Sequence, residues 1–113
     1  MKNVKELVGA STSVLVLSVL AQEASYGYQI IKRINGAADG LFVWQEGTVY
    51  PVLHKLEQDG CVRTQWQQAE TGRERKYYYI TAQGREALSK GKQQWEDFHQ
   101  LVLQLGDAAH GQA

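Results

Sequence analysis

Residues 46 to 60 have the sequence EGTVYPVLHKLEQDG, in which an apolar and a polar set of residues alternate at helical spacing. Its apolar residues recur at helical spacing, a pattern typical of a helix that packs one face on a core: Val49, Val52, Leu53 and Leu56. Asp59 and Gly60 form a stop signal after it. Pro51 fits such a helix if it lies in the first turn, where backbone amides lack intrahelical partners.

The other face of this predicted helix is polar and carries Thr48, Tyr50, His54 and Lys55. Hydroxyl groups in the first turn suit an anion, because free amides and the helix dipole favour negative charge there. The longer side chains of His54 and Lys55, one turn later, are of the kind that reach phosphates or base edges in DNA. Taken alone, the stretch fits a DNA-binding face and a solvated helix face equally well.

Two more helices are predicted ahead of this stretch. Residues 4 to 22 become apolar nearly all round in their second half, which is typical of a buried helix. Ser25 occupies an N-cap position before YGYQIIKRI (26 to 34), which predicts an amphipathic helix with Lys32 and Arg33 on its outer side. The Asn-Gly and Asp-Gly pairs within residues 35 to 47 predict a turn followed by a short extended piece.

The periodicity changes after Gly60. CVRTQWQQ (61 to 68) alternates between its two faces, RKYYYIT (75 to 81) is rich in aromatic and β-branched residues, and a glycine-containing turn separates them, which predicts a β-hairpin. Tyr77, Tyr78 and Tyr79 fit two interpretations, a stacking platform for single-stranded nucleic acid or rings that pack the hairpin on the core. We favour packing, with alternate rings inward.

A long final helix is predicted from Thr81, a plausible N-cap, to about Gly106. Apolar residues follow a heptad-like seam along it, with Gly91 at one seam position, and such a seam usually pairs with another helix: Leu88, Trp95, Phe98, Val102 and Leu105. The remaining residues, 107 to 113, are expected to form a flexible tail.

Composition limits the classes of function. A chain of 113 residues suits one compact unit, and twelve basic against twelve acidic residues give a net charge of zero, so DNA binding must depend on local charge. Cys61 is the only cysteine and is expected to be a buried apolar residue in a reducing compartment. The three histidines lack metal-ligand spacing, and no catalytic motif is present, so we expect no metal, no cofactor and no enzyme activity.

The N-terminus has some features of a signal peptide, since Lys2 and Lys5 precede the apolar run VLVLSVLA (14 to 21). Glu6 lies within the basic segment, however, and the run is far shorter than the roughly 20 residues of a membrane span. We therefore expect a cytoplasmic protein with no membrane partner.

Three helices, a hairpin and a long helix correspond to an α+β, mostly α, winged helix-turn-helix fold with a two-stranded wing. In YGYQIIKRI (26 to 34), EGTVYPVLHKLEQDGCV (46 to 62) and TGRERKYYYIT (71 to 81) the chain resembles the PadR family of bacterial transcriptional regulators. The resemblance implies a homodimeric, repressor-type protein that binds a palindromic double-stranded operator and is released by a small ligand or by stress. It also implies the short subfamily, with a DNA-binding domain (1 to 81) and a single dimerisation helix (82 to 106).

The resemblance and the patterns together give three sets of candidate residues. For DNA they are Tyr26, Gln29, Lys32, Thr48, Tyr50, Pro51, His54, Lys55, Arg73, Arg75 and Lys76. For a planar aromatic effector they are Ala10, Ser13, Val14, Leu17, Trp95, Phe98 and His99, with Trp95 at the place of a tryptophan that often meets its symmetry mate in the short subfamily. For the dimer interface they are Leu88, Trp95, Phe98, Val102 and Leu105.

Gln45, Glu46 and Glu74 depart from the usual PadR pattern, and two of them add negative charge near the expected DNA surface. The alternative function is therefore a winged-helix module that binds proteins and has lost DNA binding.

Overall fold

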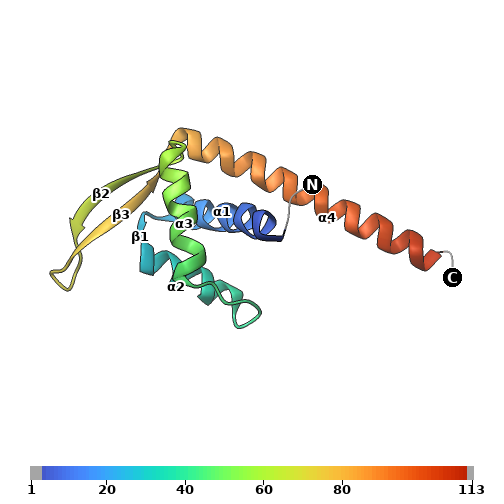
Figure 1. The fold of residues 1–113 in the computed structure, drawn as a ribbon, viewed down its shortest axis with the longest axis horizontal. Helices are drawn as coiled ribbons and strands as arrows, with labels where there is room; N and C mark the ends of the chain where they lie inside the picture. Colours follow the sequence, from blue (N-terminus) through green and yellow to red (C-terminus); the bar gives the residue numbers. More distant parts are fainter. Residues whose placement is uncertain (1–3, 112–113) are drawn as a thin grey trace.

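Four helices and a small antiparallel sheet form the fold of this computed structural model, which describes the backbone of residues 4 to 111 and the side chains of residues 10 to 107 (Figure 1). In chain order the elements are α1 (Val4–Gln22), β1 (Ser25–Tyr26), α2 (Gly27–Ala38), α3 (Glu46–Gln58), β2 (Val62–Gln68), β3 (Glu74–Ile80) and α4 (Ala82–Gly111). The predicted winged helix-turn-helix fold is confirmed.

The core lies where α1, α2 and α3 meet under the base of the hairpin. The predicted apolar stripe of α3 is confirmed, because Val49, Leu53 and Leu56 are buried and Val52 packs against them. Cys61 is also buried, as predicted. The core members from α1 and α2 are Val16, Leu17, Leu20, Ile30, Ile31 and Ile34.

The sheet has three strands in the order β1-β3-β2, one more than the predicted hairpin. The added strand β1 pairs Ser25 with Tyr78 and Tyr26 with Tyr77. Ser25 is therefore not the N-cap of α2. It is fully buried, and its hydroxyl accepts a hydrogen bond from Arg33 Nη1 at 2.7 Å, while no side chain caps α2.

The turn predicted within residues 35 to 47 lies at Asp39 and Gly40, both with positive φ, and not at Asn35 and Gly36, because α2 continues to Ala38. Asn35 has another role. Its Nδ2 donates to the carbonyl oxygen of Trp44 at 2.9 Å, and its Oδ1 accepts from the Trp44 amide at 2.7 Å. This amide side chain fastens the loop before α3 to the end of α2.

Pro51 lies in the second turn of α3 rather than the first, since the helix already begins at Glu46 with Gln45 as its N-cap. A proline there removes the hydrogen bond to the Gly47 carbonyl and brings its ring towards that group. Gly47 is exposed, so solvent can hydrate the free carbonyl. The predicted stop is confirmed, with Gly60 at a φ of 75°.

The last helix begins as predicted, since the Gly84 amide donates to Thr81 Oγ1 at 3.0 Å. Its first half packs on α1, and a Cβ at Gly91 would lie 2.7 Å from Cγ2 of Val14, so the glycine permits this close approach. Leu88 is buried in the core of this chain, which contradicts its prediction as a dimer-interface residue. The helix continues past Gly106 to Gly111 and projects beyond the other elements (Figure 1); residues 112 and 113 of the predicted tail lie outside the described residues.

Candidate nucleic-acid interface

The outer face of α3 is the centre of the candidate interface. Tyr50, Pro51, His54 and Lys55 are all exposed there, while Thr48 is half-buried. The inward stripe holds the helix on the core, so these side chains share one outward face. The three-stranded sheet joins the same helix at its C-terminal end, and β2 and β3 project from it as the wing (Figure 1).

Tyr50 has a packing role that the sequence did not indicate. A Cβ at Gly27 would lie 2.6 Å from Cε1 of Tyr50, so the ring lies directly on the first residue of α2. Burial raises the pKa of the Tyr50 phenol, nearby Glu46 raises it further, and Arg75 acts in the opposite direction. The ring is still 41% exposed. Tyr50 thus joins α3 to α2 and presents its outer edge to solvent.

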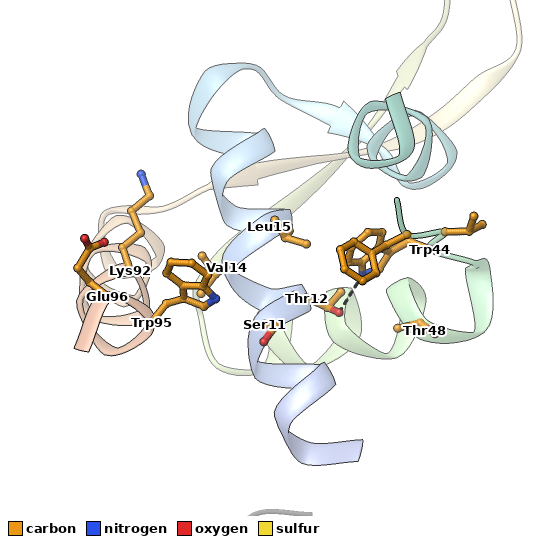
Figure 2. A pocket seen from close by; sticks show the side chains of 11 residues that line it. Ser11, Thr12, Val14, Leu15, Trp44, Thr48, Lys92, Trp95 and Glu96 are labelled. Atoms are coloured by element: carbon orange, nitrogen blue, oxygen red, sulfur yellow. Dashed lines mark hydrogen bonds between the residues drawn. The ribbon is translucent and has the colours of Figure 1, made fainter. Parts of the chain in front are cut away.

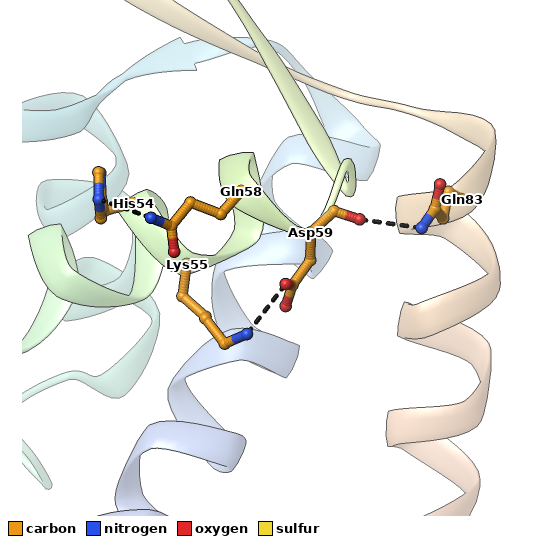
Figure 3. Close-up of polar contacts among 5 residues, drawn as sticks. All are labelled: His54, Lys55, Gln58, Asp59 and Gln83. Carbon is orange, nitrogen blue, oxygen red and sulfur yellow. Dashed lines mark hydrogen bonds and ion pairs between the residues drawn. The ribbon is translucent and has the colours of Figure 1, made fainter.

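Intramolecular contacts occupy the polar side chains at the C-terminal end of α3 (Figure 3). Lys55 Nζ lies 2.9 Å from Asp59 Oδ1, and His54 Nε2 lies 3.2 Å from Gln58 Nε2. Gln83 Nε2 donates to the Asp59 carbonyl oxygen at 2.9 Å, which fastens this end of α3 to α4. The Lys55 side chain remains 70% exposed, so an exposed pair of this kind leaves it free to exchange partners.

The base of the wing packs on the core through Tyr78, which is 6% exposed, whereas its neighbours Tyr77 and Tyr79 are half-buried. This arrangement confirms the packing interpretation of the tyrosine run. Lys76 also belongs to the base of the wing, because its Nζ lies 3.4 Å from Glu57 Oε1. It is therefore a paired cation in this structure.

A second polar cluster lies where the wing meets α2. The guanidinium of Arg75 lies 4.4 Å from the ring centroid of Tyr26, and Tyr26 packs edge-on against Tyr77 at 5.5 Å. Arg75 Nε and Gln29 Oε1 are buried and have no hydrogen-bond partner among the residues that the structure describes. Three predicted DNA-contact residues thus lie at this junction: Tyr26 on β1, Gln29 in the first turn of α2 and Arg75 on β3.

The remaining predicted cations are more peripheral. Arg73 is exposed at the wing tip, and Lys32 is exposed on α2 with its Nζ 5.6 Å from the ring centroid of Tyr28. Arg33 has a structural role instead, since it donates to the Glu23 carbonyl oxygen at 3.1 Å and to Gln22 Oε1 at 3.1 Å.

A cleft of about 830 Å³ lies over α1, between α4 and the loop before α3 (Figure 2). Its lining contains Val14 and Trp95 from the predicted effector set but not Ala10, Ser13, Phe98 or His99. Leu17 is 2% exposed within the core and cannot line it. His99 stacks on Trp95 with ring centroids 5.1 Å apart. The full lining is Ser11, Thr12, Val14, Leu15, Phe42, Val43, Trp44, Thr48, Lys92, Trp95 and Glu96.

The loop wall of this cleft was missed at the sequence level. The signal was the apolar run from Leu41 to Trp44, which we interpreted only as an extended piece. Trp44 is fixed by its backbone contacts with Asn35 and by a hydrogen bond of 3.1 Å from Nε1 to Thr12 Oγ1. The cleft also includes Thr48, so it reaches the first turn of α3.

Within the described residues, no group of three or more metal-ligating side chains could hold an ion, and no helix is long and apolar enough to cross a membrane.

This arrangement of helices and wing defines a winged helix-turn-helix protein. The model of the transcriptional regulator PadR-like family matches residues 16 to 90, and the chain belongs to this family. PadR family regulators bind DNA and typically form dimers.

Relatives with known structures share the fold over most of their length. A transcriptional regulator from Clostridium thermocellum is 29% identical, with a TM-score of 0.79 over 88% of this chain and 96% of the other. A PadR family regulator from Clostridium difficile is 28% identical, with a TM-score of 0.72 over 83% of this chain and 96% of the other. The Escherichia coli transcriptional regulator YqjI is 28% identical over 78% of this chain but only 41% of its own length.

Proposed function

We propose that this protein is a transcriptional repressor that binds a palindromic operator as a homodimer in the bacterial cytoplasm, associated with the nucleoid when bound. The observation that carries the proposal is the outward face of α3, where Tyr50, His54 and Lys55 are exposed beside a wing with Arg73 at its tip. In winged-helix proteins this helix enters the major groove, and phosphate contacts fix its position there.

The charges of α3 predict modest affinity. Glu46, Glu57 and Asp59 oppose the single Lys55 on or next to this helix, and the whole chain has no net charge. Few phosphates would then be neutralised, and the logarithm of affinity should fall with the logarithm of salt concentration less steeply than a slope of about −8.

Footprinting on the DNA upstream of the protein's own coding region tests the proposal. We expect protection of a palindrome, and Lys55→Ala should weaken binding by about 1 to 3 kcal/mol, the usual size of a specific contact. Lys90→Ala is the matched control, because Lys90 forms the same kind of exposed i,i+4 pair, with Glu86 on α4. Absence of protection at low salt would favour the alternative, a protein-interaction module.

The cleft favours a second role, the sensing of a planar aromatic or phenolic effector. Its volume falls within the roughly 300 to 1,000 Å³ of small-molecule sites, and its lining is mostly apolar with a few polar groups. Trp44 and Trp95 both line it and lie on opposite sides of α1 (Figure 2). Flat rings bind such walls through stacking and burial.

Tryptophan fluorescence during titration with planar aromatic cations and phenolic acids tests this role. We expect quenching that is reduced in Trp44→Phe and Trp95→Phe but retained in Trp66→Phe, because Trp66 lies on the wing and is 66% exposed. Quenching that depends equally on all three residues, or none with any compound, would rule out an effector site in this cleft.

A further inference from the structure

Glu57 is the one acidic side chain on α3 whose two carboxylate oxygens contact different strands of the wing, among the contacts of the described residues. Its Oε2 accepts a hydrogen bond from Thr64 Oγ1 on β2 at 3.0 Å. Its Oε1 lies 3.4 Å from Lys76 Nζ on β3. The carboxylate therefore sits in the angle between α3 and the wing.

Lys76 is held in this angle from two sides. Its Nζ lies 5.6 Å from the ring centroid of Tyr78 in addition to its contact with Glu57. The paired side chains are 37% and 36% exposed, compared with 70% and 46% for Lys55 and Asp59. Partial burial reduces screening by water and salt, so the Glu57–Lys76 pair is the more persistent of the two.

We infer that Glu57 withholds Lys76 from DNA and thereby lowers the affinity of the protein for duplexes of any sequence. The inference rests on the proposed DNA-binding function. When α3 lies in a major groove and the wing reaches the neighbouring backbone, the strand between them passes the angle that holds this pair. A phosphate there meets a neutral pair instead of a free cation, so no counterion is released for that contact.

The consequence concerns selectivity. Phosphate contacts strengthen binding to every sequence alike, whereas contacts of α3 with base edges distinguish sequences. A neutralised Lys76 lowers the affinity that comes from phosphate contacts and leaves the affinity that comes from base contacts unchanged. Glu57 is thus a specificity-determining residue that acts through Lys76.

Glu57→Gln tests this inference, because glutamine keeps the size of the side chain and can still accept the Thr64 hydrogen bond. Binding to an operator duplex and to a random-sequence duplex is measured by fluorescence anisotropy across a salt series. With Lys76 free, we expect the slope against salt to steepen by about 0.9 and affinity for the random duplex to rise about five- to tenfold near 0.1 M salt.

Glu74→Gln is the matched control, since it removes the same charge from the start of β3, where Glu74 is exposed and has no ion-pair partner within the described part of the chain. It should leave the slope unchanged. Lys76→Gln alone should also leave the slope unchanged. Combined with Glu57→Gln, it should return the slope to that of the unmodified protein.

Two outcomes would overturn the inference: equal slopes for Glu57→Gln and Glu74→Gln, or a slope that becomes shallower by a full contact in Lys76→Gln alone. The second outcome is measured on Lys76→Gln alone, so it does not require Glu57→Gln to fold. A failure of the proposed function looks different, because the unmodified protein would then bind neither duplex at low salt.

Discussion

Tyr78 illustrates, at the scale of a single residue, how the wing is attached to the domain. The residue is 6% exposed. Its backbone pairs with Ser25 on β1 and with Thr64 on β2. Burial raises the pKa of its phenol above the ordinary value of 10.0, and the charges of Glu57 and then Tyr50 raise it further. Ionisation of this phenol is therefore opposed in the folded state.

This shift predicts loss of stability in alkali. The unfolded phenol ionises near pH 10 while the folded phenol still holds its proton, so the folded state binds more protons and stability falls as pH rises further. Below pH 10 the contribution of Tyr78 is constant. Urea unfolding at pH 8 and pH 11 should show a smaller loss for Tyr78→Phe than for the unmodified protein.

Tyr28→Phe is the control for this measurement, because it makes the same change at a side chain that is 49% exposed rather than buried. An equal alkaline loss in both variants would show that Tyr78 is not the responsible group.

The sequence predicts where the candidate DNA-contact residues lie, but it predicts only some of their intramolecular hydrogen-bond and ion-pair partners. Helical spacing places His54 and Lys55 on the outer face of α3, and i,i+4 spacing already pairs them with Gln58 and Asp59. The contact of Lys76 with Glu57 joins residues 19 positions apart in the chain. Such contacts depend on the packing of the wing, which no local pattern encodes.

At the scale of elements, long periodic segments were predictable and short or tertiary-determined ones were not. The helical period identified α3, a nearly all-round apolar segment identified α1, alternation identified β2, and aromatic and β-branched composition identified β3. Strand β1 has two residues, too few for any alternation, and it exists because β3 offers a free edge. The end of α2 was misplaced because Asn35 binds Trp44 across the loop instead of forming a turn.

The last helix shows a further limit of periodicity. One continuous apolar seam covers two environments, since Leu88 lies in the core of its own protomer whereas Trp95 and Leu105 are exposed. A heptad pattern predicts that an apolar stripe on a helix is buried, but it does not predict which surface buries it. Gly91, interpreted as a seam position, instead allows α4 to approach α1 in the same chain.

The molecule as a whole is elongated, with extents of 62 × 30 × 24 Å, because the second half of α4 projects from the domain (Figure 1). This half exposes a group of apolar side chains, each between 46% and 62% exposed: Trp95, Phe98, Leu101, Val102, Leu103 and Leu105. Large apolar side chains left exposed along one half of a helix are typical of an interface. A second copy of the same helix would cover it in a twofold arrangement.

Leu105→Glu therefore should dissociate the proposed dimer. Burial of one leucine contributes about 1.5 kcal/mol or more, and twofold symmetry doubles the effect, so the dissociation constant should rise about 100-fold or more. Sedimentation equilibrium measures this constant directly. The melting temperature of the unmodified protein should also rise with protein concentration, because association stabilises the folded state.

Leu41→Glu separates this interface from a general effect of charge on exposed apolar surface. Leu41 is 80% exposed in the loop before α3 and does not line the cleft, so its substitution should leave the dimer intact. Two half-sites of a palindrome bind cooperatively only when the protomers are joined. Leu105→Glu should consequently lose affinity for the full operator while its affinity for a single half-site is unchanged. Equal loss on both DNAs, or a monomeric unmodified protein, would contradict dimerisation through this half of α4.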